Sequence, residues 1–277
     1  MRTRSLTSSA TLTNVPALIQ RLLIVITLAC TAPAFAGRPC EENSYDPKKV
    51  MQALEFAHKT QIKLDESQAN VAIIARVGQD LSKYNLRYSH LGLIEHLPDG
   101  TWSVMHELNQ CGTANSELFR EGLGNFFMDD MFAFETLILI PNTELQQKIQ
   151  QVMADGRARN LHAARYNMLS YAYSTMYQNS NQWALEVLAA AQANDVRIEN
   201  RTQAQAWLKS ASYKPDTLNI PSLTRLGARM FRANVAFDDH PFDRRMAGQI
   251  DTVTVESIVR FMMTRDPKAQ KIVIGQP

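Results

Sequence analysis

Leu86-Arg-Tyr-Ser-His-Leu-Gly-Leu-Ile94 and Thr101-Trp-Ser-Val-Met-His-Glu-Leu108 are the two segments that decide the fold, and Pro98-Asp99-Gly100 lies between them. Both are short and rich in aliphatic, aromatic and β-branched residues, as strands are. The residues between them fit a three-residue loop, with a type I turn at Pro98-Asp99 and Gly100 in the left-handed conformation. The sequence therefore predicts an antiparallel hairpin with one histidine on each strand.

The register of this hairpin determines whether the two histidines can act together. A three-residue loop pairs Leu97 with Thr101. His90 and His106 then share one face of the sheet as diagonal neighbours, with their Cα atoms roughly 7–8 Å apart. A two-residue turn would put them on opposite faces, but Pro98 is poorly suited to the last paired position before such a turn. We therefore expect both imidazoles on one face.

A serine at a predicted helix start follows much later, in Tyr177-Gln-Asn-Ser-Asn-Gln-Trp-Ala-Leu-Glu-Val-Leu188. Two imidazoles beside such a hydroxyl outline a hydrolase site, with Ser180 as nucleophile, His90 as base and His106 orienting the base. Backbone N–H groups at the helix start would hold an oxyanion, and Asn179 and Asn181 are expected to contact the substrate. The alternative is structural, because Asn and Ser are preferred caps and Asn179-x-x-Gln182 is a capping-box pattern.

The first 36 residues have the composition of a signal peptide. Arg2, Arg4 and Arg21 precede an apolar run over residues 22–32, which is too short to span a bilayer. Ala34-Phe35-Ala36 supplies the small residues of a cleavage site. We therefore expect cleavage near Ala36 and a periplasmic or secreted single domain over residues 37–277, without a transmembrane segment.

The charge of the mature chain argues against nucleic-acid binding. The whole chain has a formal charge of +2, and cleavage removes three arginines and no acids, which leaves −1. The remaining charges are interspersed, so no basic stripe is available for a phosphate backbone. The expected partner is a small molecule, a peptide or a cell-envelope ligand.

Export also bears on the cysteines, because Cys40 and Cys111 are the only thiols after residue 36. Two cysteines in an oxidising compartment most simply form one disulfide. The alternative makes Cys111 a catalytic nucleophile. Its context, Asn109-Gln-Cys-Gly-Thr113, is a loop after a strand and offers no helix start to stabilise a thiolate.

The rest of the chain predicts a mixture of strands and helices. A helix begins at Asp46-Pro47 with an apolar face of Val50, Leu54, Ala57 and Ile62, and Thr143-Glu-Leu-Gln146 is a capping-box start for another helix. The predicted strands are 70–77, 134–140 and 250–254, and the predicted helices also include 143–154, 180–193, 202–211, 222–233 and 255–263. This order indicates an α+β fold, with helices packed on a small antiparallel sheet.

These residues resemble the permuted papain-like thiol hydrolases, relatives of the NlpC-type peptidases and of lecithin retinol acyltransferase. Ser89-His90-Leu91-Gly92, Val104-Met105-His106 and Asn179-Ser180-Asn181-Gln182-Trp183 match the three motifs of that group in order. The resemblance implies a permuted papain-like fold and hydrolysis or transfer at an amide, peptide or ester bond, without a cofactor. The group has cysteine where this chain has Ser180, so the alternative is a non-catalytic periplasmic binding protein with a degenerate site.

The chain also resembles, over nearly its whole mature length, the bacterial family named domain of unknown function 2145. Four stretches carry this resemblance: Tyr88-Ser-His, His106-Glu-Leu-Asn-Gln-Cys-Gly-Thr113, Gly124-Asn-Phe-Phe-Met-Asp-Asp130 and Phe237-Asp-Asp-His-Pro241. The resemblance implies no established activity.

Two acidic clusters raise the question of a metal site. Asp129-Asp130 is one, and Asp238-Asp239-His240 with Asp243 is the other. Carboxylates and an imidazole at such spacing can bind a divalent cation, but each cluster offers few ligands, and Asp-rich turns are common in loops. We therefore predict no metal. Glu107 is expected to face away from both histidines, as a surface or pairing residue.

Overall fold

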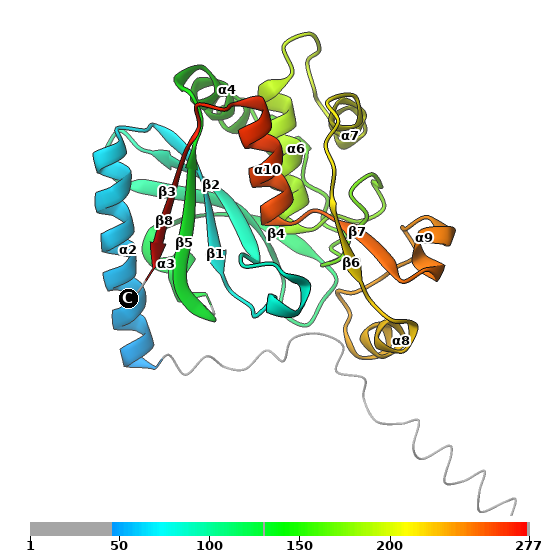
Figure 1. Ribbon diagram of the computed structural model, residues 1–277. Coiled ribbons are helices and arrows are strands. Elements are labelled where there is room, and N and C mark those ends of the chain that lie inside the picture. The colour runs from blue at the N-terminus through cyan, green and yellow to red at the C-terminus, as the bar shows by residue number, and fades with distance from the viewer. Residues whose placement is uncertain (1–45, 130, 276–277) are drawn as a thin grey trace, which may run out of the picture. The chain divides into compact units, whose positions relative to one another are not determined.

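Six strands form one antiparallel sheet in the computed structural model, which describes residues 46–129 and 131–275 (Figure 1). The strands are β1 (Val71–Val77), β2 (His90–His96), β3 (Trp102–Asn109), β4 (Ser116–Gly122), β5 (Ala133–Ile140) and β8 (Gln270–Gly275). Their order across the sheet is β4-β3-β2-β1-β5-β8. A separate pair consists of β6 (Asp216–Asn219) and β7 (Gln249–Thr252).

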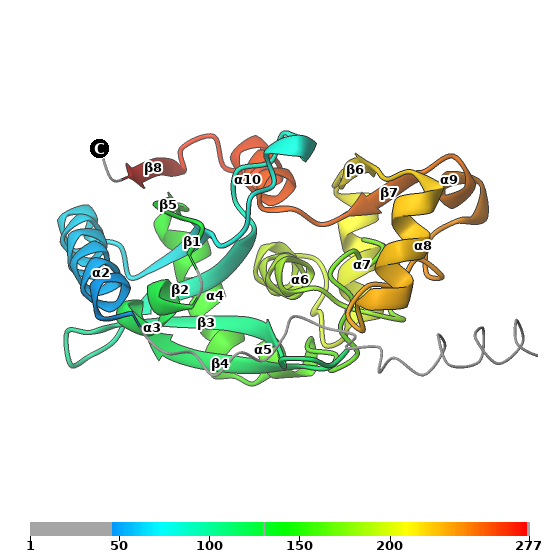
Figure 2. The same cartoon turned by 90° about the horizontal axis from the view of Figure 1, so that it is seen from below.

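Helices cover both faces of the sheet (Figure 2). They are α2 (Pro47–Ser67), α3 (Leu123–Met128), α4 (Thr143–Ala154), α5 (Arg157–Asn160), α6 (Ser180–Gln192), α7 (Arg201–Ser210), α8 (Ser222–Phe231), α9 (Phe242–Met246) and α10 (Val255–Arg265), with a 3₁₀ turn η1 (Ser82–Tyr84). Phe56 of α2 and Phe126 and Phe127 of α3 form one core cluster with the strands. Side chains from α4, α6 and α10 form a second cluster with the strands. The fold is thus α+β, as predicted.

Helix α6 is the centre of the molecule. Every residue from Ser180 to Gln192 is buried, which explains why its apolar residues are not confined to one stripe. The Trp183 indole is fully buried and donates to the Ala158 carbonyl oxygen at 2.9 Å. The N-terminus of α6 is therefore held in the interior, where it can meet the strands.

The hairpin that decides the fold is confirmed. Gly100 adopts φ 84°, in the left-handed region, and the Leu97 N–H donates to the Thr101 carbonyl oxygen at 2.8 Å. The β2–β3 pairs run from His96↔Trp102 to Leu93↔Met105, which is the register of a three-residue loop. The ladder ends at that last pair, so the two strands have no backbone pairing at His90 and His106 themselves.

Two details of the predicted helices are wrong. The buried face of α2 consists of Ala53, Phe56, Ala57, Thr60 and Leu64, whereas the predicted face residues Leu54 and Ile62 are exposed. Helix α4 is capped by Asn142, whose side chain accepts from the Leu145 N–H, and not by Thr143. The Gln146 amide oxygen accepts instead from the backbone N–H groups of Asn70 and Val71, at the start of β1.

Several short elements were not expected, namely β4, β6, β8, α3, α5 and α9. The most important of them is β4, an edge strand that pairs with β3 over its whole length. Within residues 46–129 and 131–275, no helix has both the length and the apolar character needed to cross a bilayer. The predicted signal peptide lies outside the described residues, and the periplasmic or secreted location stays a prediction.

Candidate active site

The two histidines lie side by side, as the register predicts. The distance between His90 Nε2 and His106 Nδ1 is 2.8 Å. Gly92 makes this approach possible, because a Cβ atom there would lie 2.6 Å from Val104 Cγ1 and 3.2 Å from the Cβ of His106. A side chain at position 92 would therefore push β3 away and separate the imidazoles.

Ser180, the predicted nucleophile, is the first residue of α6. Its Oγ lies 3.1 Å from His90 Nδ1. Asn179 is the N-cap, and its side-chain oxygen accepts from the Gln182 N–H at 2.8 Å. The cap orients the helix start, so that the hydroxyl one residue later points to the imidazole. The structure thus brings the three predicted catalytic residues into one hydrogen-bonded row.

The row continues to a residue that the sequence reasoning missed. His106 Nε2 lies 2.9 Å from a carboxylate oxygen of Glu121, and Glu121 belongs to the unexpected strand β4. Phe119 pairs with His106 across the β3–β4 ladder, and residues two apart on a strand face the same side. Prediction of β4 would therefore have put Glu121 on the histidine face.

One arrangement of protons satisfies every contact in this row. The Glu121 carboxylate accepts from His106 Nε2–H, which leaves Nδ1 of His106 as an acceptor. His90 Nε2–H then donates to that atom, and His90 Nδ1 is left to accept from the Ser180 hydroxyl. Both imidazoles are neutral in this arrangement. It is a polarised path from a serine hydroxyl to a carboxylate.

The surroundings favour the neutral form of His90. Burial lowers its pKa well below the usual value, and the nearby charge of Arg76 and the neighbouring His106 lower it further. The Phe126 ring lies against both imidazoles, with ring centroids 6.0 Å from His90 and 5.4 Å from His106. Arg76 is held by the Phe126 carbonyl oxygen and the Asp129 carboxylate. His90 is therefore neutral at neutral pH, and its Nδ1 can accept a hydrogen bond from Ser180.

The two asparagines expected to contact substrate have different environments. Asn179 acts as a cap, and its amide nitrogen donates to the Met168 carbonyl oxygen and to Thr252 Oγ1, so its side chain is committed to the fold. The amide nitrogen of Asn181 donates to the Ser89 carbonyl oxygen at 3.4 Å. Its side-chain oxygen is buried and has no hydrogen-bond partner within the described part of the chain. Substrate contact by either side chain stays a prediction.

Tyr166 also lies at the nucleophile. It is buried, and its phenol is close enough to the Ser180 side chain to interact with it. Burial and the nearby Glu107 raise the pKa of Tyr166, so the phenol stays protonated. Its position in a loop segment gave no signal in the sequence.

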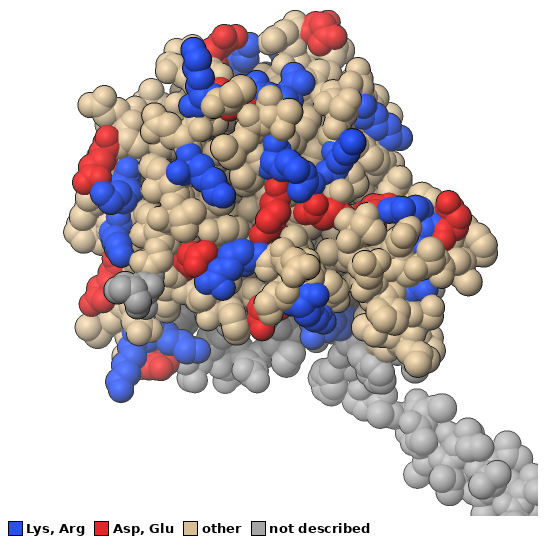
Figure 3. All heavy atoms as spheres, viewed as in Figure 1, with Lys and Arg blue, Asp and Glu red and all other residues tan. Residues whose placement is uncertain are grey.

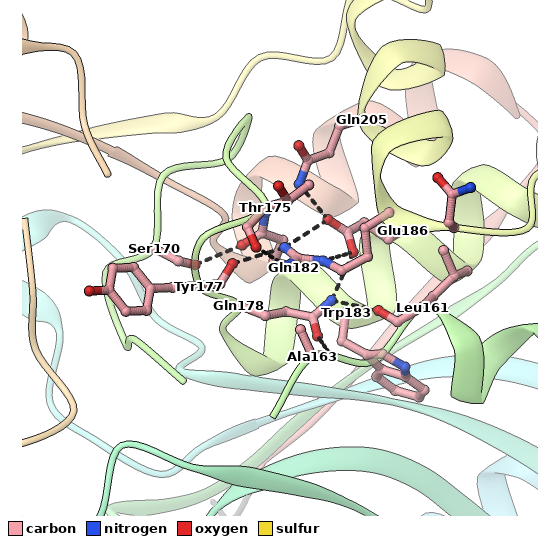
Figure 4. A network of polar contacts seen from close by, with 12 residues as sticks. Leu161, Ala163, Ser170, Thr175, Tyr177, Gln178, Gln182, Trp183, Glu186 and Gln205 are labelled. Carbon is pink, nitrogen blue, oxygen red and sulfur yellow. Dashed lines mark hydrogen bonds and ion pairs between the residues drawn. The ribbon is translucent and has the colours of Figure 1, made fainter. Parts of the chain in front are cut away.

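A buried ionic network holds the segment that precedes Ser180 (Figure 4). Glu186 of α6 is fully buried, and its carboxylate accepts from Arg201, Gln178 and Gln205. Arg201 in turn donates to the carbonyl oxygens of Thr175 and Tyr177. The network therefore ties the loop before Ser180 to the body of α6 and fixes the nucleophile in place.

Glu107 faces away from the histidines, as expected, but it is buried and not at the surface. Its strand position puts it opposite to His106 in the pleat, but the side chain is fully buried rather than at the surface. Ser116 Oγ donates to one carboxylate oxygen at 2.6 Å and contacts His162 Nε2 at 3.1 Å. The second oxygen has no partner among the described residues. Burial raises the pKa of Glu107 to about 8, so this carboxyl is largely protonated at neutral pH.

The acidic clusters do not form a metal site in the described residues, and the predicted disulfide includes a residue outside them. Asp129 pairs with Arg76, and Asp239 accepts from the Tyr171 N–H and contacts the His240 ring. In residues 46–129 and 131–275, no group of three His, Cys, Asp or Glu side chains could hold a metal. Cys111 lies between β3 and β4, whereas Cys40 lies outside the described residues. The Cys40–Cys111 disulfide therefore stays a prediction.

Comparison with known protein families identifies the family of this chain. Residues 63–262 match the family described as uncharacterized protein conserved in bacteria (DUF2145). The chain belongs to this family. The match spans every residue of the Ser180–His90–His106–Glu121 row. No curated protein and no solved structure matches the chain.

Proposed function

We propose that this DUF2145 protein is a hydrolase or transferase that attacks an ester, amide or peptide bond with the Ser180 hydroxyl. The observation that carries the proposal is the hydrogen-bonded row from Ser180 through His90 and His106 to Glu121, with contacts of 3.1, 2.8 and 2.9 Å. A hydroxyl needs a base within hydrogen-bonding distance to become a nucleophile. The row supplies that base and two groups behind it.

The proton path follows from the protons assigned above. As Ser180 Oγ bonds to the carbonyl carbon of the substrate, its proton passes to His90 Nδ1. The Nε2 proton of His90 moves on to His106 Nδ1, so the positive charge resides on His106, beside the Glu121 carboxylate. Collapse of the tetrahedral intermediate breaks the bond to the leaving group, and the protons return along the row to that group. Water or a second acceptor then releases the acyl group by the same steps.

The start of α6 supports the developing negative charge. The first N–H groups of a helix have no partner within the helix, and Asn179 satisfies the one on Gln182. The N–H groups of Ser180 and Asn181 are thereby left to face an oxyanion, with the positive end of the helix dipole behind them. Removal of one such donor in a comparable site costs about 10²–10³ in rate.

The permuted papain-like fold and the periplasmic or secreted location belong to the same proposal. Support for the fold relation is the order of the elements: a histidine strand, a second histidine strand and then a helix that begins at the nucleophile. Support for the location is the arginine-flanked apolar run before Ala34-Phe35-Ala36. An acyl or peptide ligand from the cell envelope fits both.

A fluorophosphonate probe tests the proposal without knowledge of the substrate. We expect the mature protein to be labelled at Ser180, and the S180A and H90A variants not to be labelled. E121Q keeps the shape of the carboxyl but removes its charge, so we expect labelling to slow by more than about tenfold, in line with the loss of a charge-assisted hydrogen bond. S222A is the matched control, because Ser222 is also the first residue of a helix.

The alternative, a non-catalytic binding protein, predicts a different set of outcomes. No labelling of the folded wild-type protein, together with iodoacetamide labelling of S180C, would identify a site with thiol-hydrolase geometry and no serine reactivity. Equal labelling of the S180A variant and the wild type would refute Ser180 as the nucleophile. Circular dichroism of each variant verifies that the fold is retained.

A further inference from the structure

The outer edge of β4 is covered over part of its length only. β4 is an edge strand of the six-stranded sheet. At its start, residues 164–166 lie alongside residues 114–116 as a short antiparallel bridge, and the Ser116 N–H donates to the Ala164 carbonyl oxygen at 2.9 Å. Beyond Ser116, no described residue pairs with this outer edge. The chain itself therefore shows that the edge accepts an added strand, and it leaves the rest of the edge unpaired.

The unpaired part of this edge carries two outward backbone N–H groups. Successive residues of a strand direct their N–H groups to alternate sides of the strand. The N–H of Ser116 points outward to Ala164, so those of Leu118 and Arg120 also point outward, away from β3. Neither has a hydrogen-bond partner in the described part of the chain. An unpaired edge of this kind is a template for the backbone of another segment.

A cavity of about 430 Å³ lies beside the unpaired part of the edge. Leu118, Phe119 and Arg120 line it from β4, and Arg159 of α5 and His162 line it from the segment that follows α4. We call these five residues the β4 cleft. Its volume is in the range of natural ligand sites. The cleft therefore offers a binding place to the side chains of an added strand.

One cation in the β4 cleft has no counter-charge. Arg159 is exposed, and its guanidinium has no ion-pair or hydrogen-bond partner among the described residues. The two acids nearby are engaged elsewhere. Glu95 pairs with Arg120, and Glu117 accepts from the Gln110 amide at 2.7 Å. Burial lowers the pKa of Arg120, and the nearby Arg159 lowers it further. A carboxylate in the cleft would therefore meet an unpaired guanidinium and offset the repulsion between the two arginines.

We infer that the β4 cleft binds an extended peptide as an added strand, with a carboxylate of the peptide on Arg159. The peptide backbone bonds to the outward N–H and C=O groups of Leu118 and Arg120, and alternate side chains of the peptide enter the cavity. Backbone pairing supplies affinity that depends little on sequence, whereas the arginine selects for a carboxylate. That carboxylate belongs either to an acidic side chain or to the C-terminus of the peptide.

The β4 cleft is separate from the candidate active site. Met105 and Arg120 are paired across β3 and β4. Because neighbouring residues of a strand face opposite sides of the sheet, the side chains of His106 and Glu121 lie on the other face. The inference therefore goes beyond the proposed function and does not rest on it. On the face of the molecule in Figure 3, basic and acidic side chains are interspersed, so no single-sign field there competes for the peptide.

Fluorescence anisotropy of the mature protein tests this inference. The probe is a short fluorescent peptide of alternating valine and threonine, which favours the extended form, with a free C-terminal carboxylate. The same peptide with a C-terminal amide, and an amidated version with one internal glutamate, separate the two sources of the carboxylate. We expect at least one carboxylate-bearing peptide to bind about tenfold more tightly than the plain amide, and high salt to reduce the difference. Absence of binding, or equal binding of all three peptides, would overturn the inference.

Two pairs of variants test the strand and the arginine separately. L118P removes the outward N–H without breaking a bond to β3, a change that edge strands tolerate. L118A is its matched control, because it loses the same side chain but keeps the N–H. We expect L118P to bind the peptide about tenfold more weakly than L118A. R159Q should remove the preference for a carboxylate, whereas R232Q, at another exposed arginine, should keep it.

Other occupants of the cleft give different results. Equal binding by L118P and L118A, with loss in R159Q alone, would identify a site for free anions and overturn the added strand. A dimer in light scattering that L118P converts to a monomer would also overturn the inference, because a second copy of the chain would then pair with the edge. Circular dichroism verifies the fold of each variant. Fluorophosphonate labelling of Ser180 is measured separately, so it distinguishes failure of this inference from failure of the proposed function.

Discussion

Replacement of Glu107 by glutamine should remove a pH dependence of stability that can be calculated in advance. Burial raises the pKa of this carboxyl from 4.5 to about 8 in the folded state. The folded protein therefore holds a proton that the unfolded chain releases between these two pH values. A group of this kind stabilises the fold fully below pH 4.5, and the stabilisation is lost as the pH rises towards 8.

The magnitude follows from 1.36 kcal/mol per pKa unit. Over the whole window the linkage amounts to about 4–5 kcal/mol, of which about 3–4 kcal/mol falls between pH 5 and pH 8. For a domain of this size, 1 kcal/mol corresponds to about 2–4 °C in Tm. Between pH 5 and pH 8, the Tm of the wild type should therefore fall by about 7–14 °C more than that of E107Q.

Urea unfolding, monitored by circular dichroism at several pH values, measures the difference in free energy of unfolding between the wild type and E107Q. Burial also lowers the pKa of His90 and His162, which contribute with the opposite sign, and raises the pKa of Glu186, which contributes with the same sign. Both proteins share these contributions, so the subtraction cancels them. E117Q is the control, since Glu117 is an exposed carboxyl on the adjacent strand. It should follow the wild-type curve. Parallel curves for E107Q and the wild type would refute the assignment of a protonated, buried Glu107.

Two further variants test what holds the candidate site. E186Q leaves the Arg201 guanidinium buried without its counter-charge, so we expect the free energy of unfolding in urea to fall by about 3–5 kcal/mol. A change below about 1 kcal/mol would contradict the role of the network in Figure 4. G92A places a methyl group 2.6 Å from Val104 Cγ1. We expect the free energy of unfolding to fall by about 1–3 kcal/mol and the probe to label Ser180 more slowly. Labelling at the wild-type rate would show that the imidazoles tolerate the displacement.

The features that the sequence predicts well depend on local chemistry. The hairpin register rests on Pro98-Asp99-Gly100, whose turn preferences are properties of these three residues. The start of α6 rests on Asn179, a preferred cap beside its helix. These two local features predicted the histidine face and the helix start, and the resemblance to the permuted papain-like hydrolases suggested that the two meet. The distances between the side chains of Ser180, His90 and His106 agree with that expectation.

The features that the sequence did not predict depend on distant partners. Ser116-Glu-Leu-Phe-Arg-Glu-Gly122 has only one fully buried residue, so its alternation is too weak to identify β4, and Glu121 was missed with it. The burial of Glu107 depends on α6 and on the segment around His162, both far away in the chain. The inward face of α2 depends on contacts with α3, and for that reason the apolar residues Leu54 and Ile62 were assigned to the wrong side.

The geometry changes the role expected for His106. An orienting residue needs only to hold His90, whereas a second proton acceptor must also carry the positive charge. Arg76 disfavours that charge on His90, and Glu121 lies beside His106 at 2.9 Å, so the charge is more stable on the second imidazole. H106N separates the two roles, because asparagine offers an acceptor oxygen to His90 but cannot take up its proton. If His106 is the acceptor, the folded H106N variant should lose most of its probe labelling; labelling at close to the wild-type rate would show that His106 only orients the base.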